Sequence, residues 1–157
     1  MSETLTVLSF WLHSIAMTIF IGHYLLLALI TLPAVRKSPL GTTGPVLSGI
    51  SRQSRRWMYI SIILFMLTGI YLMFADPNYL GVGDFGNFWS VMMLVKHILI
   101  LVMIGAGFWF NAILRVGPML NSRNGAEQAF GRFNLYVNIM AISGVLVLLL
   151  TALAQIQ

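Results

Sequence analysis

The chain has 157 residues, of which 59% are hydrophobic and only 8% are charged, whereas a soluble domain usually carries about 25% charged residues. This balance excludes an ordinary soluble domain and indicates a protein embedded in lipid. The absence of cysteine excludes a disulfide framework, a thiolate metal site and an iron–sulfur cluster.

Four apolar stretches are long enough to cross about 30 Å of hydrocarbon as helices. They cover residues 5–35, 57–74, 88–114 and 130–154. Helices are expected because a short chain cannot close a barrel and lipid leaves no backbone group unpaired. The first stretch is too long for a signal-peptide core, so we expect it to be retained. The sequence therefore predicts one all-α domain over residues 1–157, an integral membrane four-helix bundle of up-down-up-down topology.

The basic residues indicate how the bundle is oriented. Of the nine, eight fall in the first and third connections: Arg36, Lys37, Arg52, Arg55, Arg56, Arg115, Arg123 and Arg132. The positive-inside rule assigns that side to the cytoplasm, which places both termini outside. The net charge of +5 is thus a topology signal, and no nucleic-acid partner is expected. We predict a multi-pass protein of a bacterial-type inner membrane, with the lipid bilayer as its first partner.

The first connection, residues 36–56, is rich in Gly, Ser, Pro and Thr. Such a composition is typical of loops. We therefore expect a flexible link on the cytoplasmic side.

Ionisable side chains inside the spans are the main functional signal, because each costs a few kcal/mol to insert into lipid. His13 lies about 8 residues, or about 12 Å, into the first span, and His97 lies about 9 residues into the third. Both spans enter from the outer side, so the two imidazoles are expected at one level. Two neutral imidazoles facing each other across a bundle suit the axial positions of haem b.

Three further residues are expected to shape or surround such a haem site. Gly69 and Gly144 would leave room for the macrocycle on the second and fourth spans, although close helix packing is the simpler explanation for each glycine taken singly. Lys96 either pairs with a haem propionate or extends its ammonium to the outer interface. His23 lies about 80° around the helix from His13 and deeper, which favours a structural or second-site role.

Methionines provide a competing interpretation. Met17 follows His13 by four positions and Met93 precedes His97 by four, so each pair shares a helix face. Thioether and imidazole together form a soft ligand set suited to copper(I). Methionine is also adaptable core material, which explains the same residues without a metal.

Several short motifs carry a resemblance to a known superfamily. The first span has Trp-Leu-His-Ser-Ile-Ala at 11–16, Gly22 and Leu-Pro-Ala at 32–34; the second has Thr-Gly-Ile-Tyr-Leu at 68–72. The third has Phe-Trp at 88–89 and then Lys96, and Arg-Phe-Asn at 132–134 stands at the start of the fourth. Together these motifs resemble the HemJ-type protoporphyrinogen oxidases and the CopD-like copper-resistance membrane domains over nearly the whole chain.

The resemblance implies a four-helix haem-b protein that oxidises a porphyrinogen, with His13 and Lys96 at the positions important in the HemJ-type family. The chain departs from that family at Leu135, which stands where a glutamate follows the asparagine. His97 is a second imidazole outside the family pattern. The CopD-like side of the resemblance implies copper uptake.

Three functions remain open from the sequence. The first is a small membrane cytochrome b, with His13 and His97 as ligands, that transfers electrons between a quinol or a larger membrane complex and an outer acceptor. The second is a copper-binding or copper-transport protein, and the third is a cofactor-free accessory subunit. If the protein is an enzyme, we expect an oxidoreductase, since the sequence has no phosphate loop or nucleophilic triad.

Overall fold

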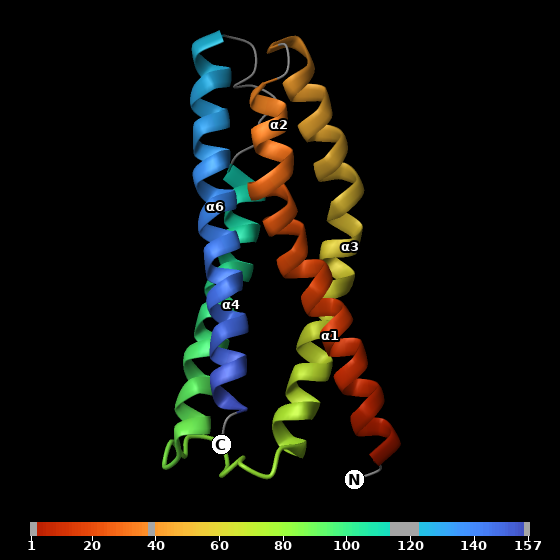
Figure 1. Ribbon diagram of the computed structural model, residues 1–157, viewed down its shortest axis with the longest axis vertical. Helices are drawn as coiled ribbons and strands as arrows, with labels where there is room; N and C mark the ends of the chain where they lie inside the picture. Colours follow the sequence, from red (N-terminus) through yellow and green to blue (C-terminus); the bar gives the residue numbers. More distant parts are fainter. Residues whose placement is uncertain (1–2, 38–39, 114–122, 156–157) are drawn as a thin grey trace.

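The protein is helical throughout the regular elements of its computed structural model, which describes residues 3–37, 40–113 and 123–155 (Figure 1). In chain order the elements are α1 (Glu3–Leu26), a π-helical turn η1 (Leu27–Thr31), α2 (Leu32–Arg36), α3 (Leu40–Ala75), α4 (Phe88–Ile113) and α6 (Arg123–Ala154). The all-α prediction is confirmed. Both chain ends lie at one end of the molecule (Figure 1), which we call the terminal end.

Among the described residues, four helical segments are long and apolar enough to cross a membrane: Glu3–Arg36, Arg52–Ala75, Phe88–Trp109 and Glu127–Ala154. The spans expected at 5–35, 57–74, 88–114 and 130–154 overlap these segments, except that residue 114 lies outside the described residues. Large apolar side chains are exposed along all four. Burying them in water-free surroundings is favourable, so a lipid bilayer is the environment that these helices fit.

The expectation of a flexible first connection is wrong for most of its length. Helix α3 begins at Leu40 and continues without a break to Ala75, so residues 40–56 extend the second span as helix. Ile50 packs against a small core around Leu27, Leu32 and Val137. Extending an existing helix needs no new nucleation, and this packing offsets the weak helix propensity of glycine, serine and threonine.

The helices form two pairs, α1 with α3 and α4 with α6, and the two pairs meet near the middle of the molecule, where α1 crosses α6. Helix α1 packs on α3 and on α6, and α6 packs on α4. At the crossing Gly144 of α6 lies so close to α1 that a Cβ there would stand 2.8 Å from Cγ2 of Ile21. Toward the terminal end, the α1/α3 pair and the α4/α6 pair diverge (Figure 1). The absence of a side chain at Gly144 thus sets the point from which the pairs separate.

Proline explains the irregular turn between α1 and α2. Pro33 stands in the first turn of α2, and proline has no N–H to donate to the carbonyl four residues earlier. That carbonyl belongs to Leu29, inside η1 (Leu27–Thr31). The wider π-helical turn is the local accommodation of this missing hydrogen bond.

The link between α3 and α4 is tied down by short-range hydrogen bonds. Oδ1 of Asn87 accepts a hydrogen bond from the backbone N–H of Ser90 at 2.7 Å, which caps the first turn of α4. Gly81 and Gly83 adopt positive φ angles of 124° and 83°, where glycine is favoured. The start of α4, and with it the level of Lys96 and His97, is therefore fixed.

Candidate functional site

A cleft of about 260 Å³ lies between the two helix pairs in the half nearer the terminal end. All four long helices contribute to its wall. The lining residues are Phe10, His13, Ser14, Met17, Phe65, Lys96, Val147, Leu148, Thr151, Ala152 and Gln155. Three of the predicted site residues, His13, Met17 and Lys96, therefore line one cleft.

The His13 ring is held by three neighbours on α3. Its Nδ1 lies 2.9 Å from Oγ1 of Thr68, and it stacks on Phe65 with ring centroids 4.3 Å apart at an interplanar angle of 22°. A Cβ at Gly69 would stand 3.0 Å from Cε1 of His13. Gly69 thus makes room for the imidazole itself. The sequence predicts instead that Gly69 leaves room for a haem macrocycle.

The hydrogen bonds of Thr68 decide which tautomer His13 adopts. Oγ1 of Thr68 donates its single hydrogen to the carbonyl of Leu64 at 2.6 Å, so toward His13 it can only accept. A neutral imidazole has one N–H. The hydrogen therefore sits on Nδ1, and Nε2 retains the lone pair that can bind a metal or accept a proton.

His97 adopts the same tautomer by a different route. Its Nδ1 lies 2.6 Å from the backbone carbonyl of Met93, and a carbonyl can only accept. The lone pair of His97 is consequently also on Nε2. His97 is half-buried, but it is not among the residues that line the cleft.

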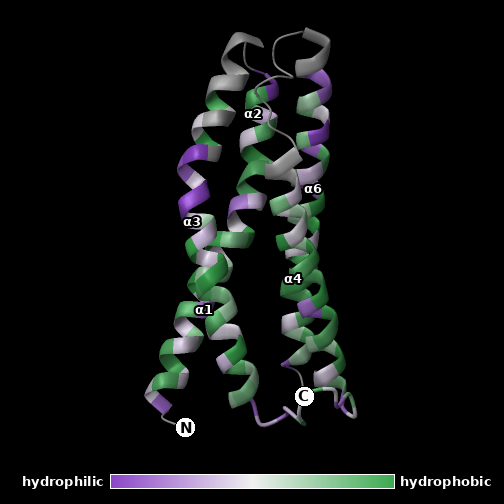
Figure 2. Cartoon of the chain, turned by 180° about the vertical axis from the view of Figure 1, so that it is seen from behind, coloured by the Kyte–Doolittle hydropathy of each residue, from purple (hydrophilic) through white to green (hydrophobic). Residues whose placement is uncertain are grey.

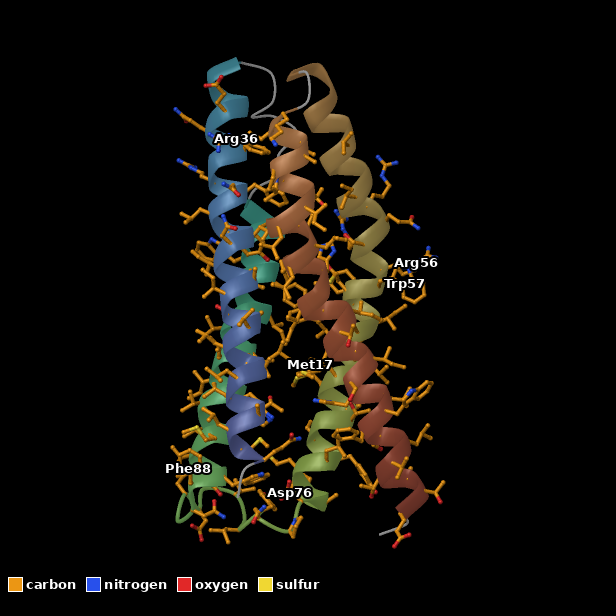
Figure 3. The ribbon with its side chains drawn as sticks, viewed as in Figure 1. Met17, Arg36, Arg56, Trp57, Asp76 and Phe88 are labelled. Atoms are coloured by element: carbon orange, nitrogen blue, oxygen red, sulfur yellow. The ribbon has the colours of Figure 1, made fainter. Side chains whose placement is uncertain are left out.

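Lys96 brings a positive charge to the cleft wall. Within the described part of the chain its ammonium makes no ion pair, and Asp76 attracts it only at longer range. Asp76 lies at the terminal end of α3 (Figure 3). A half-buried ammonium without a contacting anion is costly inside a membrane, so the cleft favours a ligand that carries negative charge.

Further polar atoms face the same space. Thr151 donates its hydroxyl hydrogen to the carbonyl of Val147 at 2.8 Å, which leaves Oγ1 as an acceptor, and Gln155 lies one turn beyond. Met17 points from α1 into the space between the pairs (Figure 3). The wall therefore offers an imidazole lone pair, an ammonium, hydrogen-bond acceptors and a thioether.

The remaining predicted residues lie elsewhere. Gly144 packs against Ile21 at the helix crossing and is not in the cleft wall. Met93 supplies its backbone carbonyl to His97. His23 has its ring centroid 5.5 Å from that of Tyr24, away from the cleft.

Two features of the structure are not predicted from the sequence. Phe65 stacks on His13, and its spacing of three and four positions from Thr68 and Gly69 could have shown that all three share a helix face. Closer to the end opposite the termini, which we call the basic end, the hydroxyls of Tyr24 and Tyr136 form a hydrogen bond of 3.0 Å between α1 and α6. No sequence spacing links two residues so far apart in the chain.

Among the described residues, no group of three or more His, Cys, Asp or Glu side chains is gathered as a metal site. No protein-family model, curated protein or solved structure matches the chain. The residues of the cleft are thus the basis for a functional proposal.

Proposed function

We propose that this protein is a multi-pass membrane haem-b protein that transfers electrons, with the haem bound between the two helix pairs. The observation that carries the proposal is the His13 imidazole at the cleft wall, with its N–H committed to Thr68. Histidine ligands of metals characteristically donate their second nitrogen in this way, which orients the ring and raises its basicity. Haem b would supply one-electron redox chemistry.

The chain's own residues suggest how the group would be held. His13 would bind from α1, and His97 from α4 is the proposed second ligand, since it has the same tautomer. Lys96 would pair with a propionate. A cavity of about 260 Å³ lies just below the roughly 300–1,000 Å³ of typical ligand sites, so a macrocycle would extend past it into the space between the diverging pairs.

Visible spectra of the purified protein, expressed with a haem precursor, test this proposal. The wild type should show a Soret band and the α band of a low-spin reduced haem. His13→Ala should lose the haem, whereas His97→Ala should retain it in a high-spin form. His23→Ala is the matched control and should resemble the wild type. A wild-type protein without a Soret band would overturn the proposal, and an unchanged His97→Ala spectrum would remove His97 as a ligand.

The proposed orientation puts both termini outside and the basic end in the cytoplasm of a bacterial-type inner membrane. Exposed Arg36 lies near the end opposite the termini, and exposed Arg56 lies between that end and the middle of the molecule (Figure 3). These positions support a cytoplasmic location of that end under the positive-inside rule. A carboxy-terminal alkaline phosphatase fusion should be active and the matching fluorescent-protein fusion dark.

The electron donor would be a quinol or a larger membrane complex. A porphyrinogen-type oxidation is the alternative reaction.

A copper-binding function is the second candidate, and it is favoured by Met17, which lines the cleft together with His13. Copper(I) is suited to this thioether and imidazole set. Metal analysis after dialysis should then show copper in the wild type and its loss in Met17→Leu. Met93→Leu tests the other proposed thioether ligand in the same way. Equal copper content in the wild type and both variants would exclude both methionines as copper ligands.

A further inference from the structure

Helices α3 and α4 are separated along most of their length, and we call the face between them the seam. In the described helices these two make hardly any backbone contact, although both pack on other helices. The rings of Tyr59 and Phe108 stack across the seam with centroids 5.9 Å apart. From that contact to the terminal end, α3 presents exposed Met66 and Ile70 and α4 presents exposed Leu101. By helical spacing these side chains lie on the same faces as Tyr59 and Phe108.

A basic face continues this seam at the other end. Arg52, Arg55 and Arg56 lie within one turn of α3, inside an arc of about 100° around the axis, and all three are exposed. Tyr59 falls within the same arc, one turn further on. Figure 2 shows this hydrophilic part of α3 directly above the hydrophobic part of the helix. Guanidinium groups, then an aromatic ring, then aliphatic side chains thus follow one another along one face.

Within residues 3–37, 40–113 and 123–155, the three guanidinium groups have no anion to pair with. Among the described residues none of them makes an ion pair or a hydrogen bond. Exposed Trp57 on the adjacent turn marks the level of the membrane–water interface, where tryptophan and tyrosine are enriched. An anionic group at that level has complementary charge and the right depth to meet all three arginines.

We propose that the α3/α4 seam is a binding site for an anionic phospholipid. The phosphate headgroup pairs with Arg52, Arg55 and Arg56, and one acyl chain passes Tyr59 and lies between Met66 of α3 and Leu101 of α4. Planar guanidinium groups bind phosphate oxygens through paired hydrogen bonds. The lipid completes the side of the bundle that the protein leaves open. The inference does not depend on any cofactor in the cleft.

Native mass spectrometry of the full chain in detergent, with equimolar phosphatidylglycerol and phosphatidylcholine, tests the proposal. The wild type should retain phosphatidylglycerol preferentially. Arg52→Gln/Arg55→Gln/Arg56→Gln should lose that preference, by roughly fivefold per arginine removed. The matched control Arg36→Gln/Lys37→Gln/Arg132→Gln removes three exposed charges of the same sign and should keep it.

A second arm tests the acyl chain. Leu101→Trp fills the seam and should reduce the number of retained lipids while the headgroup arginines remain, and glycerol phosphate should not compete with the intact lipid. Equal retention of the two phospholipids by the wild type would overturn the proposal. Equal loss of preference in both triple variants would reduce it to general attraction by a positive surface.

Discussion

Thr68 accepts a hydrogen bond from Nδ1–H of His13 over 2.9 Å, because its own hydroxyl hydrogen is given to Leu64. One threonine thereby fixes both the rotation of the imidazole and the position of its proton. Thr68 on α3 therefore determines which ring nitrogen of His13, on α1, remains available for chemistry.

Replacing Thr68 tests this relationship. Thr68→Val keeps the shape and removes the acceptor, so His13 loses its fixed tautomer. Loss of such a partner typically weakens metal affinity by about 10–100-fold, and we expect a comparable loss of haem retention during purification. Thr68→Ser keeps the hydroxyl and should retain the wild-type haem content. Equal haem content in the valine and serine variants would contradict the role given to Thr68.

Gly69→Ala should displace the His13 ring. The new Cβ would stand 3.0 Å from Cε1, so the imidazole must move by a few tenths of an ångström from Phe65 or Thr68. We expect a broadened or shifted Soret band with little change in helix content by circular dichroism. The control is Gly22→Ala on α1, where a Cβ meets no atom within 4 Å.

Gly144→Ala should destabilise the helix crossing, since its Cβ would stand 2.8 Å from a methyl group of Ile21, and a β-branched side chain in a helix has one strongly preferred χ1 rotamer. Overpacking of this kind costs about 1–3 kcal/mol. In Ile21→Ala the methyl is gone, so Gly144→Ala should cost much less in that background. A double-mutant cycle by thermal unfolding in detergent measures the coupling, and additive effects would show that the two residues do not limit the approach.

Lys96→Gln should lower the midpoint potential of the bound haem by several tens of millivolts, because a nearby positive charge favours the reduced form. Lys96→Arg keeps the charge and should leave the potential near the wild-type value. Redox titration of the purified protein distinguishes the two. An identical potential in all three proteins would place the ammonium away from the haem.

Removing the hydroxyl of Tyr24 or Tyr136 should cost about 0.6 kcal/mol, the average for hydrogen bonds between membrane helices. Tyr24→Phe/Tyr136→Phe should be less destabilised than the sum of the single variants, because each alone leaves a hydroxyl without this partner. Chemical unfolding in detergent provides the comparison. A double variant that equals the sum would argue against direct coupling between the 3.0 Å pair.

The apolar runs predicted the helices because hydropathy reports directly on lipid exposure. The ends near the basic connection were not predictable in this way. Residues 40–56 look like a loop by composition, and their helix depends on contacts of Ile50 with residues far away in the sequence. Local composition has no access to such packing.

The site was predictable only in part for a similar reason. The depth of His13 and Lys96 in their spans follows from counting residues, and both reach the cleft. Lys96 and His97 are neighbours about 100° apart around α4, so the sequence could not tell which of them faces the cleft. The use of Gly69 depends on how closely α1 and α3 approach, which only the three-dimensional structure shows.

The π-helical turn Leu27–Thr31 separates the first span into two rotational phases. A turn that is one residue wider rotates everything beyond it by about 100° relative to a regular helix. The side of α2 that meets Val137 is therefore chosen independently of the side of α1 that presents His13. Deleting one residue within the turn would rotate α2 by about 100° relative to α1. Either the face that presents His13 or the face that meets Val137 would then lose its contacts, even though no contacting residue had changed.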